Sequence, residues 1–354
     1  MSTRPRASRP ATPVTMREVA TSLGVSVMTV SRAIRGDRGI SAATRHRVLQ
    51  AVTELGYRPN DSARRLRTGE ANELVGLIVT SLGNPFYAQL AVGAEQIATA
   101  RGAGMVVAST NGDTAREREV ARDMAARRFA GLIVVPAGND HRHLSAGRLH
   151  GAPVVLAATP PRGIDADCVL VDDFGGTYEA CRMLIERGHR RIGFLGLPGS
   201  LWTGSERYRG YAAALEDSGV ALDERYVSRH RGDIQLAETS ARTILSLPDP
   251  PTALITANNR NTIGALRAVR QSPAPVALAG FDDIELADLL QLPLSVVAYD
   301  AAEVGRQAAR LLFDRIHDTG AQQTREPAAG ERRTGAQRVT IPTRIVDHPQ
   351  EPRP

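Results

Sequence analysis

The chain has 354 residues, of which 42% are hydrophobic and 4% aromatic, which suits two or three domains of ordinary size and excludes disorder throughout. All 44 basic residues are arginine. Residues 1–70 hold 13 arginines against 5 acidic residues, a net charge of +8, whereas residues 71–354 hold 31 against 33. A small basic segment on a nearly neutral body indicates a polyanion-binding part, with nucleic acid as the leading partner, because neutralising phosphates releases counterions.

The cysteines and the apolar segments indicate the compartment. Cys168 and Cys181 are too few for a disulfide framework and lack the spacing of metal ligands, so we expect two structural thiols. No apolar stretch approaches the roughly 18 residues of a membrane span, and residues 1–13 lack the hydrophobic region of a signal peptide. We therefore expect a soluble cytoplasmic protein that begins with a disordered basic arm at residues 1–13.

Residues 14–58 have the pattern of three short helices. Thr15 precedes Glu18 at the spacing of a capping box, in which each side chain accepts a hydrogen bond from the other's backbone N–H, so a helix should begin directly after Thr15. The second and third helices should begin after Ser26 and Ser41, which are favourable N-cap residues. The third carries an apolar stripe made of Val48, Leu49, Val52 and Leu55.

Residues 59–70 follow as a short hinge. Pro59 breaks the preceding element, and Asn60 can cap about two helical turns before Gly69. So short a helix is marginal by itself because helix nucleation is costly. We expect this helix to need stabilisation from a partner.

From residue 71 short apolar runs alternate with amphipathic stretches, a pattern typical of βαβ units and of parallel sheets covered on both faces. The runs predict strands at 74–79, 105–108, 131–135, 154–157, 191–195, 253–256 and 276–280, and the stretches predict helices at 87–100, 115–127, 175–187, 207–218 and 261–269. That many units favour two lobes, lobe 1 at about 71–172 and 300–330, and lobe 2 at about 173–298 and 337–346. Thr319–Gly335 looks like a disordered insertion, Arg338–Val346 has the pattern of a last pair of strands, and residues 347–354 form a tail.

Several motifs occur in a characteristic order: the run Thr15–Arg32, then Asn84-Pro-Phe-Tyr87, Arg187-Gly-His-Arg-Arg-Ile-Gly193, Arg207-Tyr-Arg-Gly-Tyr211 and Gly280-Phe-Asp-Asp283. On these residues the chain resembles the lactose-repressor (LacI/GalR) family from residue 14 to about 346. The resemblance implies an all-α helix-turn-helix headpiece, a hinge helix, and a two-lobed α/β body with the parallel-sheet fold of periplasmic binding proteins.

The resemblance also implies DNA contacts from the headpiece. Arg32 is the candidate for reading a guanine, because an arginine that forks onto O6 and N7 is the commonest specific base contact. Val27 and Met28 offer apolar contacts, with packing of Met28 against the headpiece core as the alternative. The other candidates are hydroxyl-bearing or basic residues expected mainly at phosphates: Thr15, Arg17, Ser26, Thr29, Ser31 and Thr44.

In the hinge, Asn60, Ala63 and Leu66 are the expected DNA-binding residues. Leu66 matches the family's wedge residue, which enters the minor groove at a central base step and kinks the duplex. Two hinge helices packed together in a dimer on DNA would stabilise one another. The hinge is therefore expected to fold on the operator and to act as the switch.

A small effector is expected in the cleft between the lobes, again by resemblance. Its expected ligands are Asn84, Phe86, Tyr87, Trp202, Arg207, Asn258 and Asp282. Arg207 and Asp282 could hold a diol or a carboxylate through charge-assisted bonds, while an aromatic such as Phe86 could stack on a sugar or simply pack between the lobes. Ala158 and Asn259 depart from the family pattern, which points to an effector other than a simple neutral hexose.

No motif of an enzyme, cofactor or metal site stands out. The body has no Walker loop, dinucleotide-binding glycine motif or nucleophile elbow, and Gly193–Gly199 has the character of a strand-to-helix turn. His141, His143 and His150 lie among arginines in an expected loop, where solvent exposure is commoner than metal binding. We expect no catalytic activity, no cofactor, no metal and no membrane partner.

The sequence thus predicts a ligand-responsive, sequence-specific DNA-binding transcriptional regulator, a repressor of carbohydrate-related genes that acts as a homodimer on a near-palindromic operator. Dimers are expected instead of tetramers because Ile345–Pro354 has no leucine heptads. The effector would change the angle between the lobes, and with it the spacing of the hinge helices and the affinity for DNA. The alternative is a solute-binding protein or a small-molecule enzyme on the same body, which the basic headpiece opposes.

The wedge assignment predicts that Leu66→Ala leaves effector binding and dimerisation intact, reduces operator affinity and abolishes the DNA bend, because the wedge offsets the unstacking cost only when it is inserted. Hydrogen exchange measures the folding of the hinge directly. Amides from Ala63 to Leu66 should exchange freely in the isolated protein and become protected on operator DNA. Strong protection without DNA would contradict a hinge that folds on binding.

Overall fold

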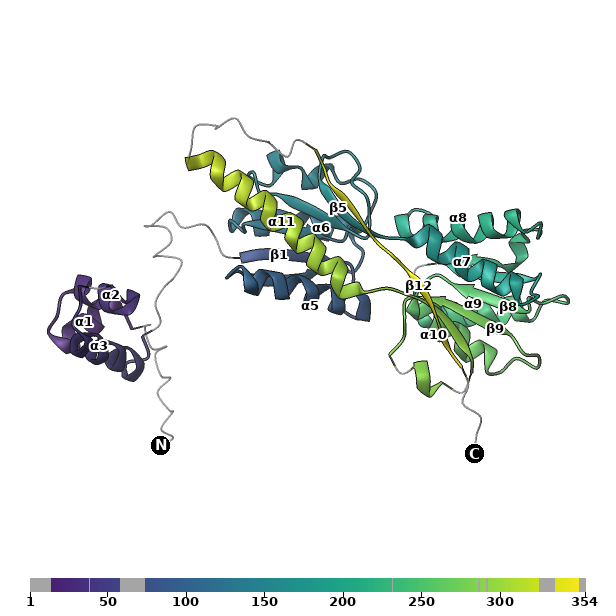
Figure 1. Ribbon diagram of the computed structural model, residues 1–354, viewed down its shortest axis with the longest axis horizontal. Coiled ribbons are helices and arrows are strands. Elements are labelled where there is room, and N and C mark those ends of the chain that lie inside the picture. Colours follow the sequence, from purple (N-terminus) through teal and green to yellow (C-terminus); the bar gives the residue numbers. More distant parts are fainter. Residues whose placement is uncertain are drawn as a thin grey trace, which may run out of the picture. The chain divides into compact units, whose positions relative to one another are not determined.

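The computed structural model divides into two compact units, residues 1–71 and 72–354 (Figure 1). The described residues are 14–37, 39–57, 74–230, 232–285, 287–290, 292–324 and 335–349. The expected basic arm, the hinge with Asn60, Ala63 and Leu66, and the end of the tail lie outside these ranges.

The first unit contains α1 (Met16–Leu23), α2 (Val27–Arg35) and α3 (Ala42–Glu54), each with a side-chain N-cap. Thr15 and Glu18 form the expected capping box: the Glu18 N–H donates to Thr15 Oγ1 at 3.3 Å, and the Thr15 N–H donates to Glu18 Oε2 at 2.6 Å. Ser26 and Ser41 cap α2 and α3 through bonds of 3.0 and 3.2 Å. The helix starts that these residues predict are confirmed.

The core of this unit lies where the three helices meet. Val19, Val30 and Val48, one from each helix, are fully buried. Leu49 and Leu55 were expected in the buried stripe of α3, but they are 42% and 40% exposed. Leu49 follows Val48 by one residue and so points about a quarter turn away from the buried face, and Leu55 lies beyond the end of the helix.

The second unit, the body, contains two six-stranded sheets. The first has the order β11-β5-β4-β3-β1-β2 and the second β12-β10-β9-β8-β6-β7, with all pairings parallel except that of β12 with β10. The strands of the first sheet are β1 (Leu74–Val79), β2 (Gly104–Ser109), β3 (Gly131–Val134), β4 (Val154–Ala157), β5 (Asp167–Val171) and β11 (Arg338–Ile341). Those of the second are β6 (Ile192–Gly196), β7 (Val227–Arg229), β8 (Ala253–Thr256), β9 (Ala277–Phe281), β10 (Leu294–Ala298) and β12 (Arg344–His348).

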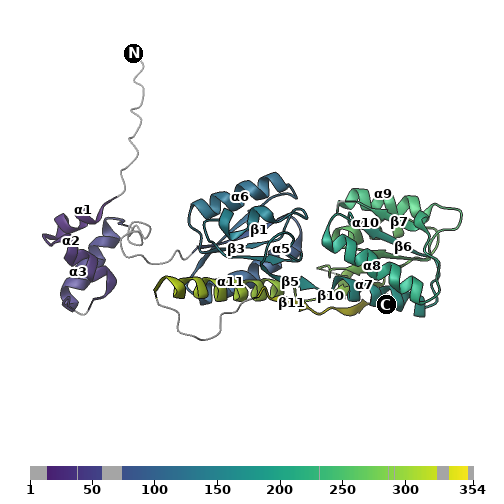
Figure 2. The same cartoon turned by 90° about the horizontal axis from the view of Figure 1, so that it is seen from above.

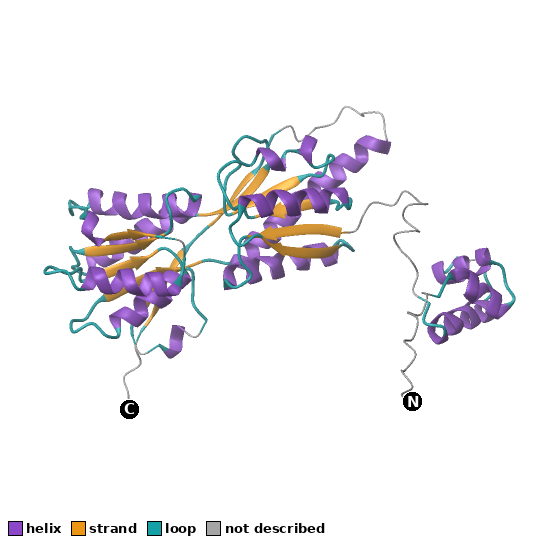
Figure 3. Cartoon of the chain, turned by 180° about the vertical axis from the view of Figure 1, so that it is seen from behind, coloured by secondary structure: helices purple, strands orange, loops and turns teal. Residues whose placement is uncertain are grey.

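Helices cover both faces of each sheet (Figures 2 and 3). Lobe 1 is the first sheet with α5 (Pro85–Ala100), α6 (Thr114–Ala126) and α11 (Ala301–Thr324). Lobe 2 is the second sheet with α7 (Asp173–Glu186), α8 (Trp202–Asp217), α9 (Ile234–Leu245) and α10 (Asn259–Val269). Short 3₁₀ turns lie at Arg142–Leu144, Ala146–Arg148, Glu224–Tyr226 and Ala287–Leu289. The expected two-lobed α/β fold with parallel sheets is confirmed.

The burial of the strands follows from this coverage. Every residue of β3 and of β8 is buried, as continuous apolar runs require when helices pack on both faces. Cys168 and Cys181 are buried free thiols, and burial raises the pKa of Cys181 to about 12. Among the helices that the structure describes, none combines the length and apolar composition of a membrane span.

Three expectations about the elements were wrong or incomplete. β5, β7, β10, α9 and α11 were not expected. The segment 337–346 was assigned whole to lobe 2, but Arg338–Ile341 pairs with β5 in lobe 1 and only Arg344–His348 joins lobe 2. Thr319–Thr324, expected in a disordered insertion, form the last turns of α11, while residues 325–334 lie outside the described ranges.

Two glycines bring α5 and α11 into backbone contact. A Cβ at Gly93 would lie 1.8 Å from the Ala302 carbonyl oxygen, and a Cβ at Gly305 would lie 1.9 Å from that of Leu90. Neither position has room for a methyl group, because the opposing atoms belong to the backbone and cannot rotate away. The contact therefore requires glycine on both helices.

Overpacking of a core usually costs about 1–3 kcal/mol. Gly305→Ala should lower the free energy of unfolding of the body by at least about 3 kcal/mol, because both helices must shift. Urea unfolding followed by circular dichroism measures the change. Gly147→Ala is the matched control, since a Cβ there meets nothing within 4 Å. Equal stability of the two variants would contradict the tight helix contact.

Candidate functional site

A cavity of about 110 Å³ lies between the two lobes of the body, with room for several water molecules or one small molecule. Its walls come from the segments that follow the carboxyl ends of the strands in both sheets. Parallel strands bring these segments to one edge of each sheet, the usual place for a ligand site in α/β proteins. We call it the interlobe cavity. Its lining includes all seven expected effector ligands: Asn84, Phe86, Tyr87, Trp202, Arg207, Asn258 and Asp282.

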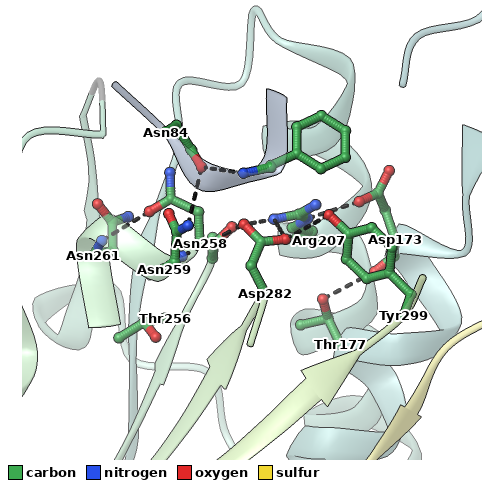
Figure 4. Close-up of polar contacts among 12 residues, drawn as sticks. Asn84, Asp173, Thr177, Arg207, Thr256, Asn258, Asn259, Asn261, Asp282 and Tyr299 are labelled. Atoms are coloured by element: carbon green, nitrogen blue, oxygen red, sulfur yellow. Dashed lines mark hydrogen bonds and ion pairs between the residues drawn. The ribbon is translucent and has the colours of Figure 1, made fainter. Parts of the chain in front are cut away.

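A buried charge network forms the floor of the cavity (Figure 4). Arg207, from α8, is 5% exposed; its Nε donates to Asp173 Oδ1 at 2.7 Å and its Nη1 to the Ala257 carbonyl at 2.5 Å. Its Nη1 also lies 3.8 Å from Asp282 Oδ1, which accepts a hydrogen bond from the Tyr299 hydroxyl at 2.8 Å. The network thus joins residues that follow β5, β8, β9 and β10.

Burial dominates the ionisation of Asp173. Removal from water raises the pKa of this carboxyl to about 6, although the neighbouring Arg207 lowers it. One carboxylate oxygen, Oδ1, binds Arg207, whereas Oδ2 is buried and has no hydrogen-bond partner among the described residues. Asp173 was not among the expected effector ligands. Its one local signal is its place two residues after the end of the buried strand β5.

Aromatic rings form a second wall. The Phe86 ring lies 5.0 Å from that of Tyr87, edge to face, and 6.1 Å from that of Tyr299. The Tyr87 hydroxyl accepts a hydrogen bond from Thr80 at 2.5 Å. Tyr299 and Thr80, like Asp173, line the cavity but were not among the expected residues. Trp202 lines it at the start of α8.

Asparagines connect the lobes beside the cavity. Asn84 Oδ1 caps α5 by accepting from the Phe86 N–H at 3.0 Å, and the same oxygen accepts from Asn259 Nδ2 of lobe 2 at 3.0 Å. Asn258 caps α10 through the Asn261 N–H at 2.8 Å. The side-chain oxygens of Asn84 and Asn258 therefore already bind the protein.

Two cavity residues have a left-handed backbone. Ala158, after β4, has φ of 59°, and Asp282, after β9, has φ of 68°. This region is unfavourable for alanine and is tolerated better by aspartate. Each residue is held there by the strand that precedes it, so the two strand ends turn sharply at the cavity.

A buried carboxylate behind the cavity holds one of its loops. Glu117, in α6, is 1% exposed and accepts hydrogen bonds from a backbone N–H of loop 136–139 at 2.6 Å and from His143 Nε2 at 2.8 Å. His141 is fully buried and bonds a carbonyl of the same loop at 2.9 Å. Solvent exposure was therefore a wrong expectation for His141 and His143, although His150 is exposed. The described residues contain no group of three metal-ligating side chains.

The candidate DNA-binding residues of the headpiece lie on and beside the first turns of its helices. Arg17 and Arg32 are exposed, and Met28 is 60% exposed, so its packing in the headpiece core is excluded. Of the others, Thr15, Ser26 and Val27 are exposed, while Thr29, Ser31 and Thr44 are partly buried. Asn60, Ala63 and Leu66 are not among the described residues.

Asp173→Asn tests the raised pKa of Asp173. Because its folded pKa of about 6 exceeds the ordinary 3.8, the folded protein holds the proton more tightly than the unfolded chain. Asp173 therefore contributes stability that is fully present below pH 3.8 and lost as the pH rises through about 6. Between pH 4 and 7 the unfolding free energy of wild type relative to Asp173→Asn should fall by about 2 kcal/mol, as followed by fluorescence of Trp202, the single tryptophan. A difference in unfolding free energy that stays constant or rises with pH would contradict the raised pKa of Asp173.

Comparison with known proteins identifies both units. Residues 15–60 match the lacI family of bacterial regulatory proteins, and residues 181–346 match the periplasmic binding protein-like domain. The chain is 30% identical over 306 residues to the ribose operon repressor of Haemophilus influenzae, covering 85% of this chain and 92% of the relative. It is 31% identical over 317 residues to that of Escherichia coli K12, covering 88% and 96%.

Solved structures agree with these relatives. A complex of the transcriptional regulator CelR with cellobiose is 29% identical with a TM-score of 0.68, covering 94% of this chain and 98% of the other. The Lac repressor dimer bound to operator and the anti-inducer ONPF is 23% identical with a TM-score of 0.78, covering 95% and 98%, and so shares the fold. The chain therefore belongs to the LacI family of bacterial regulatory proteins and is a DNA-binding transcriptional regulator.

Proposed function

We propose that the protein is a homodimeric repressor of carbohydrate-related genes, whose affinity for a near-palindromic operator is changed by a sugar or sugar derivative in the interlobe cavity. The observation that carries this proposal is the cavity itself, which has a buried charge network and an aromatic wall and is lined from both lobes. Two relatives are named ribose operon repressors, and a similar regulator is described in complex with cellobiose. These names support a sugar as the effector.

The headpiece would read the operator through α2. Arg32, exposed at the middle of that helix, would fork onto a guanine, while Val27 and Met28 would contact apolar base edges. The hydroxyls and Arg17 would position the unit on phosphates. In the hinge, Asn60, Ala63 and Leu66 would complete the contact by entering and bending the minor groove.

The effector would act by contacting both lobes at once. Asn84, Phe86 and Tyr87 of lobe 1 and Trp202, Arg207, Asn258 and Asp282 of lobe 2 would bind it. A ligand that bridges two lobes favours the arrangement in which both sets of contacts form, and this arrangement sets the spacing of the hinge helices in the dimer. By linkage, operator DNA must change the affinity for effector by the same factor.

A solute-binding protein or an enzyme on the same body is the alternative. The ribose operon repressors to which the chain is similar are regulators, and neither alternative requires a helix-turn-helix unit in a segment with a net charge of +8. The proposed function uses both units of the chain, whereas the alternative uses one.

Arg32→Ala tests operator reading. An operator selected from random duplexes should bind this variant roughly 10- to 100-fold more weakly, equivalent to about 1–3 kcal/mol, while salt-sensitive binding to random DNA persists. Arg47→Ala, which removes another exposed headpiece arginine from α3, is the matched control. It should lower the affinity for operator and for random DNA slightly and by the same factor. Equal weakening of operator and random DNA by Arg32→Ala would contradict the role in base reading.

A further inference from the structure

Asp173 presents an unused hydrogen-bond acceptor in the interlobe cavity. The residue is 2% exposed, and its Oδ2 atom is buried with no partner among the described residues. Figure 4 shows the carboxylate with one oxygen directed at Arg207 and the other turned away from it. A buried acceptor without a donor is destabilising, and more so when it is charged, so the unused oxygen calls for a donor from outside the protein.

Three polar groups beside Asp173 in the chain or in the charge network donate their hydrogen bonds elsewhere. The Thr177 hydroxyl donates to the Asp173 carbonyl at 2.9 Å, and the Gly175 N–H donates to Asp172 at 2.9 Å. The Tyr299 hydroxyl donates to Asp282. In contrast with Asp173, Asp282 has a protein donor or cation within 4 Å of each carboxylate oxygen, since its Oδ2 lies 3.5 Å from the Asn259 N–H. Asp173 alone of the two carboxylates keeps a free oxygen for a ligand.

The charge of the cavity opposes anions. Its ionisable lining residues are two carboxylates, Asp173 and Asp282, one guanidinium, Arg207, and two tyrosines whose pKa burial raises. The guanidinium directs Nε and Nη1 at protein oxygens, and its centre lies 3.5 Å from the middle of the Phe281 ring. A phosphate or carboxylate of a ligand would meet a network with a net charge of −1, and like charges repel more strongly in a site removed from water.

We infer that Asp173 is a specificity-determining residue whose free carboxylate oxygen accepts a hydrogen bond from an effector hydroxyl. The cavity thereby selects neutral polyhydroxylated ligands and rejects their carboxylated and phosphorylated forms. This inference rests on the proposed function of the cavity as the effector site. It assigns to Asp173 a discrimination that Asp282, whose two carboxylate oxygens both have partners in the protein, does not provide.

Thermal shifts and Trp202 fluorescence of the full chain test the inference with matched probes. The neutral probes are ribose, glucose and cellobiose, and the anionic probes are ribonate, gluconate, ribose 5-phosphate and glucose 6-phosphate. Wild type should bind at least one neutral probe, and bind each anionic counterpart about tenfold more weakly or not at all. This arm uses only wild type, so it decides the charge discrimination even if a variant fails to fold.

Asp173→Asn keeps one oxygen for Arg207 and places an amide donor where the free oxygen stands. Affinity for the neutral probe should fall about tenfold or more, and discrimination against anions should weaken. One monodeoxy analogue of the neutral probe should bind wild type about tenfold more weakly than the parent sugar, but should bind Asp173→Asn as well as the parent does. That loss of sensitivity identifies the hydroxyl that Asp173 accepts from.

Asp167→Asn is the matched control. Asp167 is also a carboxylate that is 2% exposed, and it is paired with Arg315 at 2.7 and 2.8 Å, but it lies in β5 away from the cavity lining. Its variant should lose stability and keep the affinity and selectivity of wild type. Equal affinity of wild type and Asp173→Asn for the neutral probe, or preference of wild type for an anionic probe, would overturn the inference and leave the effector site standing. Binding of none of the probes by wild type would overturn the sugar effector and the inference with it.

Discussion

Arg207 holds a full positive charge at a depth where 5% of its surface reaches solvent. A buried guanidinium is tolerated only when it is paired and hydrogen-bonded, since leaving it without a partner costs about 3–5 kcal/mol. The required oxygens come from Asp173 after β5, Ala257 after β8 and Asp282 after β9. The segments that follow β5, β8 and β9 must therefore be placed to within a hydrogen-bond length of Arg207. Their placement also fixes the floor of the interlobe cavity.

The left-handed residues at the cavity fit the same requirement. Asp282 turns at φ of 68° directly after β9, and this turn brings its carboxylate to Arg207 and Tyr299. Ala158 turns in the same way in lobe 1, but its methyl side chain makes no polar contact that could compensate for the strain. Backbone strain at a ligand site is compensated by the packing around it. The backbone turn after β9 thus sets the position of the Asp282 carboxylate before any ligand binds.

Features fixed by nearby residues could be predicted from the sequence, and features fixed by distant partners could not. The capping box of Thr15 is a local relation over three residues, so the headpiece helices were predicted almost to the residue. β5 and β10 were missed because they contain buried polar residues, Asp167 and Ser295, whose burial is offset by Arg315 and by Asp347 far along the chain. Asp173 was missed for the same reason, because its partner lies in another helix.

The pairing of β11 with β5, and of β12 with β10, has a consequence for synthesis on the ribosome. The edge of each sheet is completed by the last strands of the chain, and α11, which packs on α5, is also made late. The headpiece depends only on contacts among its own helices and can fold as soon as it emerges. Neither lobe can close until β11 and β12 have been synthesised, because contacts between distant residues form late. Each nascent chain therefore carries a finished headpiece for most of the time in which its body is still unfinished.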